Sequence, residues 1–111
     1  MKTINIKNGP QSVPAILLGC MRMPALSVSD AQKTICAAYD LGINFFDNAT
    51  CYTLGEAEKR FGDAFASSGI KRENVIIQTK CGIEKKTNQF DWRKETIISC
   101  VEDSLHRNHE S

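Results

Sequence analysis

The sequence of 111 residues has no long apolar run, almost no net charge and no paired cysteine motif. Its apolar stretches fall far short of the roughly 18 residues that span a bilayer, and residues 1–7 lack the uninterrupted apolar segment of a signal peptide. A formal net charge of +1 gives no electrostatic reason to bind nucleic acid or an anionic membrane. We therefore expect one cytoplasmic domain over residues 1–111, with neither nucleic acid nor membrane as a partner.

The five cysteines are odd in number, widely spaced and without a Cys-x-x-Cys pair, so neither a disulfide framework nor a zinc ribbon is indicated. Three of them, Cys20, Cys51 and Cys81, each follow the end of an expected strand and would meet at one edge of a sheet. A thiol-based redox or metal-binding module is therefore one alternative. The simpler interpretation is that small apolar side chains line a crowded edge, and we expect no metal site.

Three similar units follow one another along the chain. Apolar runs at 15–20, 43–48 and 75–81 are each followed by a polar-capped amphipathic stretch. Their spacing of about thirty residues is the length of one strand-plus-crossover unit. The pattern predicts an α/β fold with three βα units over residues 15–107, whose strands are parallel and buried on both faces.

The amphipathic stretches predict three helices. The first has Ser27 or Ser29 as N-cap and Gly42 just past its end. The second begins near Gly55, and the third has Asp91 as N-cap. The apolar positions expected to pack against the strands are, in chain order, Ala31, Ile35, Ala38 and Tyr39; Ala57, Phe61, Ala64 and Phe65; and Ile97, Ile98, Val101 and Leu105.

Two segments outside these units have turn chemistry. Asn8 and Gly9 lie between two short runs with strand character and predict a small hairpin over residues 1–14. Residues 82–89 are polar and predict a surface loop after the third strand.

Three side chains at the expected strand ends suit acid–base chemistry. Asp47 ends the second strand, Tyr52 lies in the following loop, and Lys80 ends the third strand. A free phenol has a pKa near 10, but an adjacent ammonium stabilises the phenolate, so Lys80 would make Tyr52 a usable general acid and Asp47 would hold the ammonium. The set suits protonation of a carbonyl oxygen that receives hydride. Taken singly, each residue also has an ordinary explanation, as a turn residue, a packed ring and a solvated lysine.

Four stretches together resemble the N-terminal part of an aldo-keto reductase: residues 18–23, 42–52, 58–62 and 76–80. The similarity covers residues 12–107. It implies a partial TIM (β/α)8 barrel of about three βα units, with the N-terminal hairpin at the bottom of the barrel. It also implies NADPH as cofactor and a small aldehyde or ketone as substrate.

The resemblance assigns roles to the matching residues. Asp47, Tyr52 and Lys80 would be catalytic, with Tyr52 as the general acid. The turn of Gly19, Cys20 and Met21 matches a stretch whose backbone lies near the cofactor, and Asp47 also lies beside the nicotinamide ribose.

The end of the chain departs from the family pattern. Residues 108–111 diverge where the family continues to a fourth strand and a catalytic histidine, and neither His106 nor His109 matches that residue, so we expect both to be solvated. A non-catalytic truncated remnant is therefore a second alternative. Three parallel strands do not close a barrel, so their open edges predict self-association.

Overall fold

Three short parallel strands carry the fold of the computed structural model, which describes residues 1–10, 12–84 and 86–110. They are β3 (Leu18–Gly19), β4 (Phe45–Asp47) and β5 (Ile76–Gln78), in the order β3-β4-β5. Both pairings are parallel, with Leu18 opposite Phe46 and Phe46 opposite Ile77. The predicted α/β class and the three parallel strands are confirmed. The predicted burial on both faces is wrong for β3 and β5, whose residues are half-buried or exposed because they are the edge strands, and each strand is shorter than its apolar run.

The crossover segments contain the three predicted helices, α1 (Val28–Asp40), α2 (Glu56–Ala66) and α3 (Lys94–Arg107). Ser27 is the N-cap of α1, and its hydroxyl accepts a 3.0 Å hydrogen bond from the backbone N–H of Asp30. Gly42 follows α1 with a φ of 85°, a conformation that favours glycine. Three 3₁₀ turns complete the connections: η1 (Met23–Ala25), η2 (Tyr52–Gly55) and η3 (Arg72–Asn74).

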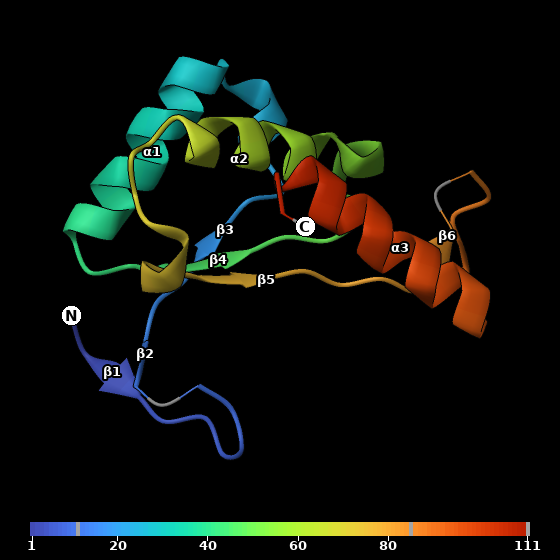
Figure 1. Cartoon of the computed structure of the whole chain (residues 1–111), viewed down its shortest axis with the longest axis horizontal. Helices are drawn as coiled ribbons and strands as arrows, with labels where there is room; N and C mark the ends of the chain where they lie inside the picture. The colour runs from blue at the N-terminus through green and yellow to red at the C-terminus, as the bar shows by residue number, and fades with distance from the viewer. Residues whose placement is uncertain (11, 85, 111) are drawn as a thin grey trace.

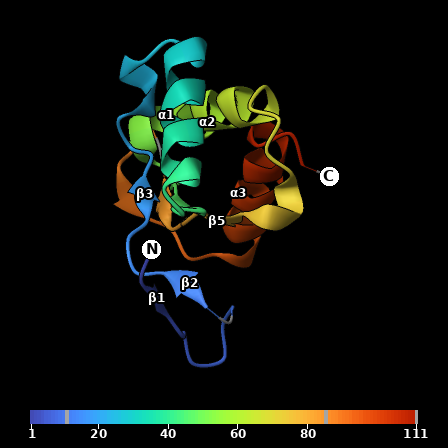
Figure 2. The ribbon, with the colours of Figure 1, turned by 90° about the vertical axis from the view of Figure 1, so that its left-hand side faces the viewer.

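Helices α1 and α2 cover one side of the sheet, as Figures 1 and 2 show. Phe46 of β4 is fully buried, and its ring centre lies 5.3 Å from that of Phe61 and 6.5 Å from that of Phe65 on α2. The predicted apolar positions of α1 and α2 are confirmed: all are buried except Tyr39, which packs against this core while partly exposed. The core is therefore a layer between the sheet and these two helices.

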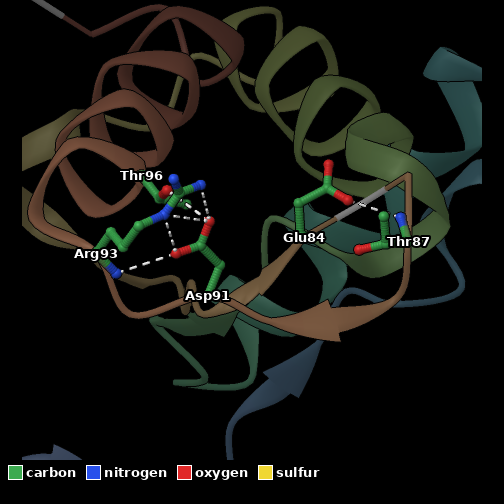
Figure 3. A network of polar contacts seen from close by, with 5 residues as sticks. All are labelled: Glu84, Thr87, Asp91, Arg93 and Thr96. Atoms are coloured by element: carbon green, nitrogen blue, oxygen red, sulfur yellow. Dashed lines mark hydrogen bonds and ion pairs between the residues drawn. The ribbon is translucent and has the colours of Figure 1, made fainter.

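Helix α3 differs from the prediction at its start and along its apolar side. Its N-cap is Arg93, not Asp91. The Asp91 carboxylate instead accepts hydrogen bonds from the Arg93 guanidinium and from the Thr96 hydroxyl (Figure 3). A short carboxylate side chain hydrogen-bonds whichever donors lie close to it, here those of Arg93 and Thr96. The presence of an aspartate before a helix does not by itself tell which donors these will be.

The predicted packing of the α3 apolar side chains is wrong. The exposed fractions of Ile97, Ile98 and Val101 are 36%, 46% and 50%, and Ser104 is the buried residue of this helix. The reason is the position of the helix: α3 meets α2 through its last turn, where the backbone of Arg107 lies against Gly62.

Two antiparallel hairpins flank the sheet. The predicted N-terminal one pairs β1 (Thr3–Ile4) with β2 (Val13–Pro14) and lies near the end at which the parallel strands begin (Figure 1). Residue 11 of this hairpin, and residue 111 of the divergent tail, lie outside the described residues.

The second hairpin corrects the surface loop expected over 82–89. β6 (Ile83–Glu84) pairs with β7 (Gln89–Phe90). The turn is held by the Glu84 carboxylate, which accepts from the backbone N–H of Thr87, and Asn88 adopts a φ of 55°. Such Asn-containing turns fit a hairpin as well as a loop. Residue 85 of the turn is not among the described residues.

In the part of the chain that the structure describes, no helix is both long enough and apolar enough to cross a membrane.

Candidate active site

The carboxyl ends of β4 and β5 bring the three predicted catalytic residues together. Asp47 is the last residue of β4, Tyr52 is the first residue of η2, and Lys80 lies two positions beyond β5. The Lys80 ammonium lies 2.5 Å from Asp47 Oδ1 and 5.1 Å from the centre of the Tyr52 ring. We call this group of Asp47, Tyr52 and Lys80 the catalytic rim, after the role that the sequence predicts for it.

Backbone hydrogen bonds extend the pairing of β4 and β5 beyond the strands and so fix the catalytic rim. The N–H of Asn48 donates to the carbonyl of Gln78 at 2.8 Å, and the N–H of Thr50 donates to the carbonyl of Lys80 at 2.9 Å. The loop from Asp47 to Tyr52 is therefore aligned with the segment that carries Lys80.

The turn that follows Tyr52 is unusual. Thr53 and Leu54 have φ values of 49° and 55°, in the left-handed region that non-glycine residues rarely adopt. Gly55, the N-cap of α2, is also in the left-handed region, with a φ of 92°. The chain reverses sharply here, which positions Tyr52 at the edge of the sheet. Strain of this kind concentrates at functional sites.

Two opposing effects act on Lys80. Partial burial alone would lower the pKa of its ammonium, but the hydrogen bond to Asp47 and the neighbouring Tyr52 outweigh burial and raise that pKa. The ammonium also donates to the backbone carbonyl of Asn48 at 2.6 Å. Lys80 is therefore a stably charged cation at neutral pH.

Sequence reasoning missed Gln78, which is the last residue of β5, two positions before Lys80. Its side-chain amide donates to Asp47 Oδ1 at 2.6 Å, so this oxygen accepts from both Gln78 and Lys80. Strand alternation gives a signal for it, because Gln78 and Lys80 are two residues apart and lie on one face of an extended chain.

The residues predicted to lie near a cofactor are next to the catalytic rim. Gly19 is opposite Asp47 in the register, and the N–H of Cys20 donates to the Asp47 carbonyl at 2.9 Å. Gly19 and Met21 are exposed. Among the described residues, apart from Gly19 itself and its two chain neighbours, none has an atom within 4 Å of the place where a Gly19 Cβ would stand. The backbone here is open to a ligand.

Cys20 itself points into the core. Its side chain is fully buried, and burial, with a smaller contribution from the Asp47 carboxylate, raises the pKa of its thiol to about 12. A thiol with so high a pKa is a poor nucleophile and metal ligand. Among the residues that the structure describes, no three His, Cys, Asp or Glu side chains form a group that would hold a metal ion. The alternative of a redox or metal module therefore gains no support from the arrangement of the thiols.

Glu58 is a buried carboxylate that sequence reasoning also missed. It is fully buried on α2 and pairs with the Arg107 guanidinium at 2.8 Å. The hydroxyl of Ser104 on α3 donates to the Glu58 carboxylate at 2.9 Å. The hydroxyl of Thr79, the residue before Lys80, donates to the same carboxylate at 2.5 Å. This network connects α2, α3 and the end of β5. Its signal is helical periodicity, since Glu58 lies on the same buried side of α2 as Phe61.

Neither histidine joins the catalytic rim through a contact that the structure shows. His106 is exposed in the last turn of α3, and the imidazole of His109 lies 2.8 Å from the Asp63 carboxylate on α2.

Comparison with known proteins gives a consistent result. A sequence model described as the aldo/keto reductase family matches residues 15–111. L-galactose dehydrogenase of Arabidopsis thaliana is 36% identical over 78 residues, which are 70% of this chain and 24% of that protein.

Two solved structures have the same fold over nearly the whole chain. The aldo-keto reductase AKR11C1 from Bacillus halodurans superposes with a TM-score of 0.81 and 28% identity, over 99% of this chain and 37% of that one. The glycerol dehydrogenase AKR11B4 from Gluconobacter oxydans gives a TM-score of 0.78 and 31% identity, over 97% of this chain and 36% of that one. Both are TIM barrels, so the three βα units correspond to part of a (β/α)8 barrel, as predicted. The chain spans about a quarter of the curated relative and little more than a third of each solved structure.

Proposed function

Because the chain belongs to the aldo/keto reductase family, we propose that it carries the acid–base part of an NADPH-dependent oxidoreductase that reduces a small aldehyde or ketone. The contact between the Lys80 ammonium and Asp47 at 2.5 Å, with the Tyr52 ring beside them, is the observation on which the proposal rests. We place this activity in the cytoplasm, without nucleic acid or membrane as a partner.

The proton for the reaction comes from Tyr52. Its hydroxyl donates to the carbonyl oxygen while the carbonyl carbon accepts hydride, and the product is an alcohol. Lys80 stabilises the phenolate that remains on Tyr52. Asp47 orients Lys80 and compensates its charge, and Gln78 in turn holds Asp47.

The raised pKa of Lys80 supports this division of roles. A group that keeps its proton through neutral and mildly alkaline pH is a weak proton donor but a permanent positive charge. Lys80 therefore acts on Tyr52 electrostatically, and Tyr52 is the group that transfers the proton.

The surroundings of β3 fit a bound nicotinamide cofactor. When bound, NADPH supplies the hydride. The residues that would hold it are Gly19 through its backbone, the exposed Met21, and the carboxylate of Asp47, and the open space at Gly19 leaves that backbone accessible. Cys20, predicted to lie beside the cofactor as well, is fully buried, and its N–H and carbonyl already bond Asp47 and Met23, so it would shape this turn and not touch the ligand.

Substitution of the two tyrosines tests the proposal. NADPH oxidation with 4-nitrobenzaldehyde is followed at 340 nm for the 111-residue chain and for Tyr52→Phe and Tyr39→Phe. We expect Tyr52→Phe to lower kcat by about 100-fold or more, because it removes the general acid. Tyr39→Phe is the matched control, since Tyr39 packs against the core on α1, and it should leave the rate within about twofold of the original.

The outcomes separate the readings of the chain. Full activity of Tyr52→Phe would refute the role given to Tyr52. No turnover by the unsubstituted chain would favour the alternative of a non-catalytic remnant.

A further inference from the structure

Hairpin β6–β7 presents two aromatic rings that the proposed mechanism does not use. The exposed fractions of Phe90 and Trp92 are 74% and 64%, high values for such large apolar side chains. Their ring centres lie 5.9 Å apart, and the planes differ by only 11°, so the two rings are stacked. We call Phe90 and Trp92 the aromatic pair.

The aromatic pair lies close to the catalytic rim. The indole of Trp92 rests directly on Gly82, because a Cβ added to Gly82 would come within 2.2 Å of the Trp92 ring. The N–H of Asp91 also donates to the Gly82 carbonyl at 2.9 Å. Gly82 is two residues beyond Lys80, so their Cα atoms are at most about 7 Å apart. The same edge of the sheet therefore carries the catalytic rim and the aromatic pair.

Polar contacts hold the hairpin in one shape. Figure 3 shows the Asp91 carboxylate bound by the Arg93 guanidinium and the Thr96 hydroxyl, and Glu84 bound to Thr87 on the other side of the hairpin. The Arg93 guanidinium hydrogen-bonds Asp91 and holds the pKa of that carboxyl far below its usual range, so the pair stays ionised. Ring positions fixed in advance need no ordering when a ligand binds.

The charges next to the aromatic pair do not favour an anion. Arg93 is paired with Asp91 at 2.7 Å, so the residue that follows Trp92 has its positive charge balanced. A shallow depression lined by Phe90 and Trp92 is bordered by the Gln89 amide and by the Glu84 carboxylate, which accepts a hydrogen bond from the backbone N–H of Thr87 and would repel a negatively charged ligand. The surface is therefore suited to an uncharged ligand with a flat apolar face and a polar edge.

We propose that the aromatic pair selects, among carbonyl substrates of the proposed reductase, those that carry a ring. The ring stacks on the exposed aromatic surface while the carbonyl reaches the catalytic rim. Aromatic side chains favour flat partners through their polarised faces, beyond the area that is buried. Phe90 and Trp92 thus determine specificity, whereas Tyr52 carries the chemistry. This inference rests on the proposed function.

Binding can be measured without turnover because Trp92 is the sole tryptophan of the chain. Its indole N–H gives one signal in a ¹⁵N–¹H correlation spectrum. The 111-residue chain is titrated with acetophenone, which carries a flat ring, and, separately, with 2-octanone, a ketone of equal carbon number without a ring. We expect a saturable shift of the indole signal with an apparent Kd about three- to tenfold lower for acetophenone.

Two variants complete the design. Phe90→Ala removes one ring and keeps the reporter, and it should weaken acetophenone binding about three- to tenfold while changing 2-octanone binding less. Leu41→Ala is the matched control, because Leu41 is 70% exposed but lies just past α1, and it should change neither Kd. The dispersion of the same spectra reports whether each variant is folded, and Phe90→Leu replaces Phe90→Ala if that variant unfolds.

The result is independent of catalysis. Equal affinity for the two ketones, or no saturable shift at all, would overturn the proposal, and so would unchanged ring preference in the Phe90 variant. A ring-selective shift in a chain that never oxidises NADPH would support the aromatic pair as a binding surface and count against the proposed reductase alone.

Discussion

At the scale of single residues, Asp47 Oδ1 is an acceptor that two donors share. It accepts hydrogen bonds from both Lys80 and Gln78. A carboxylate oxygen with two donors keeps a fixed direction, and it fixes in turn the position of the ammonium beside Tyr52. Gln78 fixes Asp47, and Asp47 fixes Lys80, so the half-exposed Lys80 is held beside Tyr52 without deep burial.

Cys20 allows a direct prediction at this scale. Its thiol is buried in the core and its pKa is raised to about 12, so at pH 8 almost none of it is thiolate. We expect Cys20 to resist alkylation by iodoacetamide in the folded chain, while the half-buried Cys51 and Cys81 react faster. Peptide mass spectrometry after timed labelling measures this, and denaturant should abolish the difference. Equal labelling of Cys20 and Cys51 in the folded chain would contradict the structure.

The catalytic rim was predictable from sequence because strand ends are a robust feature. Asp47 and Lys80 follow apolar runs about thirty residues apart, and neighbouring parallel strands end at one edge of a sheet. Ser27 was predictable for a similar reason, since a helix cap is made within three residues.

The sequence predictions fail in two situations: where the residues that contact each other are far apart in the sequence, and where several nearby donors compete for one side chain. Asp91 has the side chain of a helix cap, yet it binds Thr96 and Arg93 instead. The apolar residues of α3 have helical spacing, but spacing does not say which surface is covered. Glu58 escaped notice because its partners Ser104 and Arg107 are more than forty residues away.

At the scale of elements, the buried Glu58 network attaches α3 to the rest of the fold. Glu58 on α2 pairs with Arg107, which is only 19% exposed, and accepts from Ser104 and Thr79. Because Gly62 has no side chain, the end of α3 comes close enough to α2 to form this pair. Thr79 precedes Lys80, so the same network supports the segment that carries Lys80.

Arg107→Met tests the network. It leaves the Glu58 carboxylate buried without its cation, and we expect the free energy of unfolding to fall by about 3 kcal/mol. Urea denaturation followed by circular dichroism measures the change. The control Lys33→Met removes a cation from an exposed pair, whose side chains are 74% and 58% exposed, and should cost under about 1 kcal/mol.

A double substitution distinguishes the pair from general packing. Adding Glu58→Gln to Arg107→Met removes the charge that lost its partner and should restore part of the stability. Losses that simply add would show that Glu58 and Arg107 do not stabilise each other.

At the scale of the whole molecule, apolar surface is left uncovered. β3 and β5 are the two edges of the three-stranded sheet, and Ile16, Leu17, Ile98 and Val101 are exposed. In the solved relatives this chain corresponds to little more than a third of the barrel. Unpaired strand edges and apolar patches of this kind favour association with other chains.

We therefore expect the chain to self-associate. Sedimentation velocity at increasing concentration should show a rising weight-average mass. Val101→Glu places a charge on the exposed side of α3 and should shift the association to at least several-fold higher concentration, whereas the Leu41→Ala control should not. A strictly monomeric chain across the micromolar range would contradict this expectation.

The central claim is that the ends of β3, β4 and β5 form part of a nicotinamide-dependent site. Thermal unfolding of the 111-residue chain by circular dichroism, with and without 1 mM NADPH, tests it most directly. We predict a cooperative transition whose midpoint rises with NADPH, because a ligand that binds the folded state stabilises it, and a rise that Asp47→Ala abolishes. A midpoint indifferent to NADPH, or a melt without a cooperative transition, would contradict the claim.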